Sequence, residues 1–171
     1  MKYILETERL TLRELIIDDT EFIIELVNSP GWLKFIGDRN IKTTEQATAY
    51  LENGPIKSYR DNGFGLAMVE TKDAKKQIGM CGIIKRDSLD SPDIGFAFLP
   101  EFTGKGYAFE IASATLAFAT HQLKLPVICA ITVPGNVHSI KLLEKIGLKF
   151  IKTINSPENE ELLLYSNEKI I

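Results

Sequence analysis

An apolar, strand-like segment leads directly into a glycine-containing loop, and this loop opens a long, alanine-rich helix. The strand is predicted over 94–99, the loop over 101–106 and the helix over 107–122. Gly104 and Gly106 allow the loop backbone to approach a ligand closely, at angles that strain other residues. The first amides of a helix have no partner within it and lie at its positive end. The junction therefore predicts a binding site for a pyrophosphate group.

Two common phosphate-binding motifs do not fit this loop. The last glycine of a G-x-G-x-x-G fingerprint would fall on Phe109, and no G-x-x-x-x-G-K-[ST] run occurs in the chain. Two glycines also suit a tight turn that binds nothing, so the loop by itself leaves both interpretations open.

A second helix start follows the next predicted strand, 127–133. The helix over 137–146 begins after Asn136, and Ser139 lies in its first turn. Asn136 suits the N-cap position, where its side chain would accept a hydrogen bond from the helix backbone. Capping and ligand binding do not exclude each other at this residue.

The order of the other elements predicts the fold class. Hydrophobic periodicity and turn residues predict further strands over 9–15, 64–70, 77–85, 148–154 and 162–166. A helix is predicted from about Asp19, and another from Thr43 or Thr44, interrupted near Gly54 and Pro55. The sequence is thus α/β (α+β) with a mostly antiparallel central sheet, and its 171 residues suit a single domain over 1–171.

Composition narrows the function classes. A net charge of −3 argues against nucleic acid as a partner, and no apolar run is long enough to span a membrane. Cys81 and Cys129 are far apart in apolar runs, which predicts reduced, buried thiols in a cytoplasmic protein. Two isolated histidines provide no metal site.

The two helix starts, taken together, resemble the acetyl-CoA-binding core of the GCN5-related N-acetyltransferases (GNAT). The family signature Q/R-x-x-G-x-G/A falls on residues 101–106, with Glu101 in place of the usual Gln or Arg. Segments 6–14, 64–70, 78–82 and 93–96 resemble the branch that contains the RimJ and RimL ribosomal-protein N-terminal acetyltransferases. The resemblance implies a mixed sheet of six to seven strands, splayed between the fourth and fifth, with about four helices.

The resemblance also implies where acetyl-CoA binds, as a co-substrate and without a metal. Amides from about residue 102 to 107 would bind the pyrophosphate, and the splayed strands would bind the pantetheine arm. The implied cofactor-binding residues are Phe96, Phe98, Leu99, Phe102, Thr103, Gly104, Lys105, Gly106, Tyr107, Asn136 and Ser139.

Catalytic roles follow from the same resemblance. Many family members protonate the departing CoA thiolate with a Tyr, and Leu143 occupies that position here. Ser139 is the predicted substitute, acting directly or through water. Asp93 is the predicted base for the acceptor amine, ahead of Glu101 and His138. A backbone amide at a strand bulge near residues 98–99 would stabilise the oxyanion.

The acceptor side is less defined. Trp32 and Phe35 lie where the family's first helices line the acceptor groove, and both equally suit the core. The predicted reaction is direct acetyl transfer in a ternary complex to a protein N-terminus or a small-molecule amine, by a monomer or homodimer. The alternative is a non-catalytic CoA-binding module, which Leu143 favours.

Overall fold

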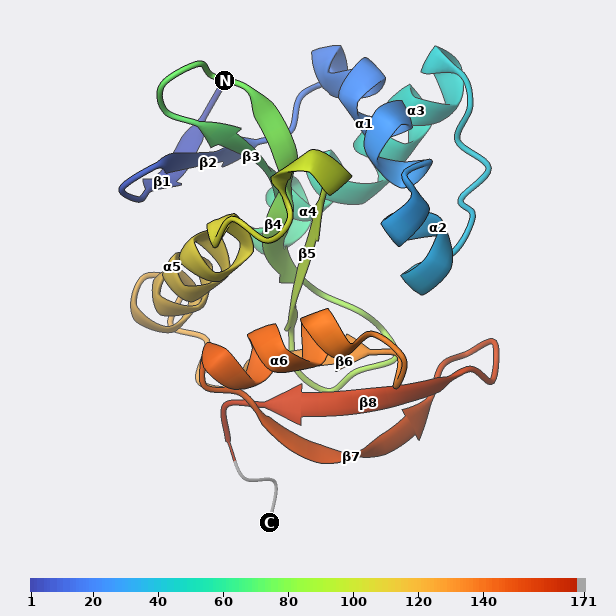
Figure 1. Ribbon diagram of the computed structural model, residues 1–171, viewed down its shortest axis with the longest axis vertical. Helices are drawn as coiled ribbons and strands as arrows, with labels where there is room; N and C mark the ends of the chain where they lie inside the picture. The colour runs from blue at the N-terminus through green and yellow to red at the C-terminus, as the bar shows by residue number, and fades with distance from the viewer. Residues whose placement is uncertain (169–171) are drawn as a thin grey trace.

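The computed structural model describes residues 1–168, and one eight-stranded sheet forms its centre. The strand order is β1-β2-β3-β4-β5-β6-β8-β7, and the β5–β6 pair is parallel while the other pairs are antiparallel (Figure 1). The strands are β1 (Tyr3–Glu6), β2 (Leu10–Glu14), β3 (Leu66–Thr71), β4 (Gln77–Ile84), β5 (Asp93–Phe98), β6 (Cys129–Thr132), β7 (Lys149–Asn155) and β8 (Glu161–Ser166).

Helices cover both faces of this sheet. The helices are α1 (Thr20–Val27), α2 (Pro30–Phe35), α3 (Thr44–Leu51), α4 (Lys57–Asn62), α5 (Tyr107–His121) and α6 (Val137–Lys145), with short turns η1 (Ile17–Asp19) and η3 (Pro100–Phe102). Helices α5 and α6 pack with one hydrophobic cluster, and α1 to α3 pack with a second cluster on the other face. Side chains of β3 alternate between the two clusters, as a strand covered on both faces requires.

Local sequence signals explain several of these boundaries. The Thr43 hydroxyl accepts a hydrogen bond from the Gln46 amide at 3.2 Å, and the Gln46 side chain accepts one from the Thr43 amide at 3.1 Å. This reciprocal capping box begins α3, as predicted. The predicted helices at 107–122 and 137–146 are confirmed as α5 and α6, to within one residue at their ends.

The predicted interruption near Gly54 and Pro55 is confirmed for the α-helix, but it is a π-helical segment and not a break in the chain's helical path. The chain stays helical through a π-helical segment, η2 (Glu52–Ile56), which joins α3 to α4. Proline lacks the amide that a regular α-helical turn needs, and the wider turn accommodates that loss.

The sheet is larger than predicted, and so is the set of helices. The chain pairs β1 with β2 in front of the first predicted strand, which gives eight strands rather than six or seven among residues 1–168. The number of helices exceeds four because the first helical region divides at Ser29, the N-cap of α2, and the second divides at the π segment. The last strand, β8, inserts between β6 and β7.

The predicted splay is confirmed between the fourth and fifth predicted strands, which are β5 and β6 when β1 is counted. Their parallel pairing is limited to one register pair, Asp93 with Cys129. Beyond it the strands diverge, and the sheet opens between its upper and lower parts (Figure 1). Within residues 1–168, no helix combines the length and apolar character that a membrane crossing needs.

Candidate active site

The two edges of β5 differ in hydrogen bonding. The Leu99 amide donates to the Ile78 carbonyl of β4 at 2.9 Å, and the Pro92 carbonyl accepts from the Cys129 amide of β6 at 2.9 Å. Backbone groups of successive strand residues point to opposite edges, so Phe96 and Phe98 direct their amides and carbonyls toward β6. Because β6 pairs only at Asp93, these groups have no backbone partner across the gap within residues 1–168.

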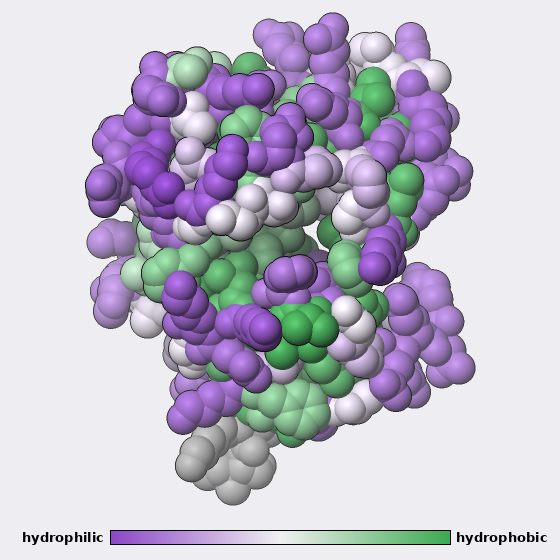
Figure 2. All heavy atoms as spheres, viewed as in Figure 1, coloured by the Kyte–Doolittle hydropathy of each residue, from purple (hydrophilic) through white to green (hydrophobic). Residues whose placement is uncertain are grey.

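The gap beside β5 has apolar walls. The side chains of Phe96 and Phe98 pack against the α5 cluster, while Ala97 packs against the cluster on the other face. Figure 2 shows apolar residues gathered across the middle of the molecule, where the surface is hollowed between its upper and lower parts. A slot with polar backbone groups on one edge and apolar side chains around it suits an amide-containing chain such as pantetheine.

The loop after β5 exposes a row of backbone amides. The first helical hydrogen bond of α5 runs from the Glu110 amide to the Gly106 carbonyl at 3.1 Å, and no side chain caps the helix. Gly104 and Gly106 have φ angles of +73° and +82°. Amides of residues 104–109 have no hydrogen-bond acceptor in the part of the chain that the structure describes. They lie at the positive end of a 15-residue helix, which favours an anion there.

Backbone contacts correct three details of the predicted site. The Phe102 amide donates to the Leu99 carbonyl at 3.0 Å, and the Thr103 amide donates to the Pro100 carbonyl at 3.2 Å. Both amides are therefore occupied by the 3-10 turn, and the free row begins at Gly104. The Leu99 amide is occupied by Ile78, and β5 pairs with β4 without a bulge. The predicted oxyanion donor near residues 98–99 is thus wrong for Leu99, while the Phe98 amide faces the gap.

A polar network that the sequence did not suggest holds this loop. The Arg9 side chain donates to Glu110 Oε2 at 2.7 Å and to the Lys105 carbonyl at 3.0 Å, and it lies 4.4 Å from the centre of the Tyr107 ring. Glu110 Oε1 accepts from the Thr7 hydroxyl at 2.6 Å and the Arg9 amide at 2.8 Å. Burial raises the pKa of Glu110, but the hydrogen bonds from Thr7 and Arg9 outweigh it, and the pKa is lowered. A charged Glu110 therefore anchors the first turn of α5.

The start of α6 follows β6, the strand across the gap from β5. The Asn136 side chain accepts from the Ser139 amide at 3.2 Å, which confirms the predicted N-cap. Ser139 is partly buried, and Leu143 follows it by one turn with an exposure of 1%. Residues four apart share a helix face, so Ser139 lies at the edge of the surface that Leu143 packs into the core.

Asp93 lies at the closed end of the gap, where β5 and β6 still pair. It is 1% exposed, and its Oδ1 accepts from Arg86 Nε at 2.9 Å. Burial raises the pKa of Asp93, and the charge and hydrogen bond of Arg86 act in the opposite direction. A raised pKa suits a base, whereas the burial and the ion pair limit its direct access to an acceptor.

Neither cysteine is activated as a nucleophile. Both are free and buried, as predicted. Burial raises the pKa of the Cys81 thiol to about 12, and burial also raises the pKa of Cys129. Thiolates, not thiols, are the attacking species, so the site does not provide a cysteine for covalent catalysis. Residues 1–168 hold no cluster of three His, Cys, Asp or Glu side chains suited to a metal.

The predicted acceptor residues separate into core and surface. Trp32 is 6% exposed in the second core cluster, and its indole N–H has no hydrogen-bond partner among the described residues. Phe35 is partly buried, with Lys34 Nζ 5.0 Å from the centre of its ring. Leu33 of the same short helix and Ile36, which follows the helix, are exposed. Trp32 thus packs as core, while its neighbours present an apolar surface.

Comparisons with known proteins agree with this geometry. A model of the acetyltransferase (GNAT) domain matches residues 9–149. The chain belongs to the GNAT acetyltransferase family. It is 29% identical over 143 residues to the uncharacterized N-acetyltransferase YnaD of Bacillus subtilis, covering 84% of this chain and 81% of that protein.

Solved structures of other acetyltransferases share the fold. The acetyltransferase from Agrobacterium tumefaciens superimposes with a TM-score of 0.82 at 24% identity, covering 99% of this chain and 95% of that one. The ribosomal L7/L12 α-N-protein acetyltransferase RimL, in complex with coenzyme A, gives a TM-score of 0.81 at 13% identity and 98% coverage of both chains. Family membership makes this GNAT protein an acyltransferase.

Proposed function

We propose that this GNAT protein transfers an acetyl group from acetyl-CoA directly to an amine in a ternary complex. The observation that supports the proposal is the row of free amides at residues 104–109 together with the free edge of β5, two sets of groups that the 3-10 turn at residues 100–102 connects. The amides match the pyrophosphate, and the backbone groups of Phe96 and the carbonyl of Phe98 match the amides of pantetheine. Lys105 and Tyr107 lie within the row, and Asn136 follows β6, the strand across the gap from β5.

When bound, acetyl-CoA supplies an activated thioester: the amine nitrogen bonds to the acetyl carbon, the C–S bond breaks and CoA leaves as a thiolate. The chain contributes placement of both substrates, which lowers the entropic cost of their meeting. The Phe98 amide, free toward the gap, donates to the carbonyl oxygen as negative charge develops there. No covalent bond to the protein is needed, in agreement with the two raised cysteine pKa values.

Two side chains handle protons in this proposal. The amine must lose a proton, and Asp93 is the proposed base, acting through water because it is buried and paired with Arg86; its pKa is raised and it lies at the closed end of the gap. The departing thiolate gains a proton from Ser139, directly or through water. A thiol pKa near 8.5 makes the thiolate a tolerable leaving group even without full proton transfer.

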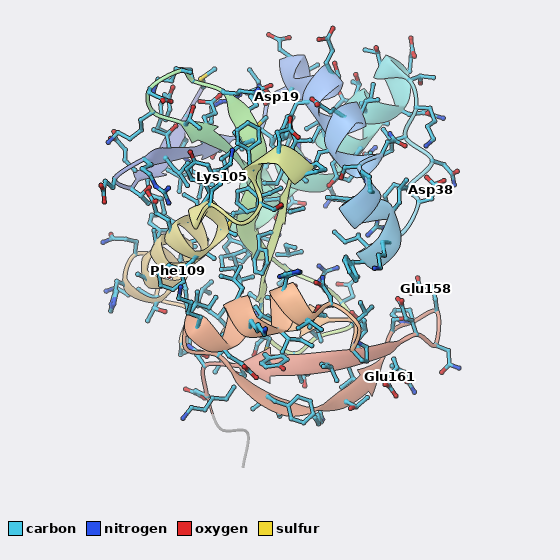
Figure 3. The ribbon with its side chains drawn as sticks, in the orientation of Figure 1. Asp19, Asp38, Lys105, Phe109, Glu158 and Glu161 are labelled. Carbon is cyan, nitrogen blue, oxygen red and sulfur yellow. The ribbon has the colours of Figure 1, made fainter. Side chains whose placement is uncertain are left out.

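The acceptor approaches from the side that α2 borders, with Phe35 in its wall, while Trp32 packs in the core. Asp38, Glu158 and Glu161 lie on the right of the view in Figure 3, away from Lys105 and Phe109 on the left. Carboxylates on this side attract amines, which are cationic before they lose a proton. We propose a protein N-terminus or a small-molecule amine as acceptor, in a cytoplasmic enzyme of the RimJ/RimL-like branch.

One observation favours a second candidate function. Leu143 is buried where many family members carry the proton-donating Tyr. A protein that binds CoA or acyl-CoA without turnover would need no proton donor there.

Thermal-shift titration with acetyl-CoA, CoA and NAD tests the binding step. A ligand present at a hundredfold excess over its Kd stabilises the folded state by about 2.7 kcal/mol. Saturable stabilisation by both CoA species and none by NAD is expected, followed by acceptor-dependent release of thiol with a panel of amines and N-terminal peptides. Stabilisation by acetyl-CoA without transfer to any acceptor would favour the binding module. No stabilisation by either CoA species would refute both.

A further inference from the structure

We propose that Lys145 of α6, held against the ring of Phe109 of α5, binds the 3′-phosphate of coenzyme A. The protein would then distinguish CoA from 3′-dephospho-CoA. This inference rests on the proposed function, because it concerns the far end of the same donor molecule. It assigns a specificity-determining contact outside the glycine loop.

Phe109 is an aromatic residue without a place in the core. It is partly buried, yet it belongs neither to the two hydrophobic clusters nor to the residues packed against them within residues 1–168. It is the last residue of the amide row and follows Gly106 by three residues, so it lies about 5 Å along the helix axis from Gly106. Figure 3 shows Phe109 on α5, on the same side of the molecule as Lys105. A ring in this position borders the proposed pyrophosphate site.

Lys145 reaches this ring from the neighbouring helix. Its Nζ lies 4.2 Å from the centre of the Phe109 ring, an arrangement in which the ring face attracts the ammonium group. No carboxylate lies within 4.0 Å of Lys145 in the described part of the chain. The contact therefore fixes the position of a cation without neutralising its charge.

The surroundings of Lys145 add positive charge. Lys141 and Lys149 lie four residues before and after it, and Lys141 shares its helix face. Like charges at this spacing repel each other, which destabilises a helix slightly. An anion between α5 and α6 would relieve that repulsion.

The 3′-phosphate of CoA is an anion that lies close to the pyrophosphate in the same molecule. It is carried by the ribose next to the pyrophosphate, so it lies within one sugar of the group assigned to the amide row. Phe109 and Lys145 join the first turn of α5 to the last turn of α6, beside that row. A phosphate contact by a lysine is a charge-assisted hydrogen bond, which is roughly twice as strong as one between neutral groups. Phe109 acts as a positioning residue, because it contacts Lys145 and not the phosphate.

Calorimetric titration of CoA and 3′-dephospho-CoA measures this contact independently of catalysis. The wild type is expected to bind CoA about tenfold more tightly than dephospho-CoA, as one charge-assisted contact allows. Lys145→Met should lower that ratio to about one by weakening CoA binding alone. Phe109→Leu should lower it partly, because Lys145 is then less restrained. Lys152→Met, which removes an exposed lysine from β7, is the matched control and should keep the wild-type ratio.

The outcomes separate this inference from the proposed function. A ratio near ten that persists in Lys145→Met would overturn the assignment, as would a Lys145→Met variant that binds both ligands more weakly to the same extent. A wild type that binds both ligands equally would also overturn it, while leaving the proposed function intact. A wild type that binds neither ligand would contradict the proposed function itself. Raising the salt concentration should narrow the wild-type ratio and leave that of Lys145→Met unchanged.

Discussion

Arg9 and Arg13 lie four residues apart at the N-terminus, and each pairs with carboxylates, but their surroundings differ. Arg13 is 2% exposed and donates to Asp19 at 2.9 Å and to Glu70 at 2.7 Å. The Arg9 side chain is 43% exposed and holds Glu110 and the Lys105 carbonyl. One network is sealed under the helices, and the other borders the proposed site.

The difference in burial gives the two arginine networks different roles, one in stability and the other in ligand binding. A charge that is removed from water depends on its partners, so breaking the Arg13 network leaves buried groups without compensation. The Arg9 network is screened by solvent and contributes little to stability, because exposed ion pairs are weak. Its effect is geometric: it fixes the loop whose amides at residues 104–109 remain free. The first network should therefore control unfolding, and the second should control binding of acetyl-CoA.

Arg13→Met provides the largest expected effect. The substitution leaves Asp19 and Glu70 as buried carboxylates without their arginine, which should destabilise the protein by roughly 3–5 kcal/mol. The melting temperature should fall by about 10 °C, measured by circular dichroism. Arg13→Lys keeps the charge but cannot donate to Asp19 and Glu70 in the same geometry, so its melting temperature should lie between those of Arg13→Met and the wild type. The folded Arg13→Met protein should keep the wild-type Kd for acetyl-CoA; a weakened Kd without loss of stability would contradict the comparison.

Gly104→Ala sharpens the comparison on the binding side. Gly104 has a φ of +73°, and an added Cβ would meet nothing within 4 Å. Gly147, at the end of α6, shares both properties with a φ of +99°. Each alanine should cost about 1–2 kcal/mol of backbone strain. Only Gly104→Ala should also weaken acetyl-CoA binding, by about tenfold in calorimetry, because relaxation of the strain there redirects the free amides. Equal binding by both variants would argue against the amide row.

Glu110→Gln should have a smaller effect on binding. The amide keeps the shape of the side chain but removes the charge that holds Arg9. The Kd for acetyl-CoA should rise roughly two- to fivefold, within the range of partly exposed ion pairs, and the melting temperature should barely change. Glu144→Gln on α6 is a suitable control for the loss of one negative charge, and its Kd should not rise. A large loss of stability in Glu110→Gln would show that the Arg9 network stabilises the fold as the Arg13 network does, which would contradict the comparison.

The smallest effect concerns pH, and the two carboxylates should show opposite signs. Hydrogen bonds lower the pKa of Glu110 in the folded state, so its contribution to stability is complete above about pH 4.3 and is lost as the pH falls through the lowered value. Burial raises the pKa of Asp93, so its contribution is complete below about pH 3.9 and is lost as the pH rises through the raised value. Urea unfolding between about pH 3 and 7 should show that Glu110→Gln and Asp93→Asn remove these opposite slopes. If the two carboxylates changed the stability with pH in the same direction, the surroundings described for either Glu110 or Asp93 would be wrong.

Much of the site was predictable because it is local in sequence. The glycine loop, the helix that it opens and the Asn136 cap each depend on residues within a few positions of one another. Propensity, capping chemistry and positive φ angles act at that range. The same holds for the capping box of α3, which the sequence also predicts. The resemblance then adds the splay between β5 and β6, which the structure confirms.

The features of the site that the sequence did not predict depend on contacts between different segments of the chain. Glu110 binds Arg9, which lies 101 residues earlier in the chain. Asp93 forms an ion pair with Arg86, and the seven-residue spacing between them does not predict this contact. Which amide of β5 is free depends on the partner strand, because a strand's two edges are chemically identical until one of them pairs. Trp32 could have lined a groove or filled the core, and packing placed it in the core.

The sequence alone therefore determined the local features: a glycine loop that opens a long helix, two cysteines in apolar runs, and strands and helices in the order of this family. Only the tertiary structure decided which backbone groups have no hydrogen-bond partner, and which of these face the gap between β5 and β6. The physical reason is that hydrogen bonds and burial are settled between distant segments, whereas turns and caps are settled between neighbours.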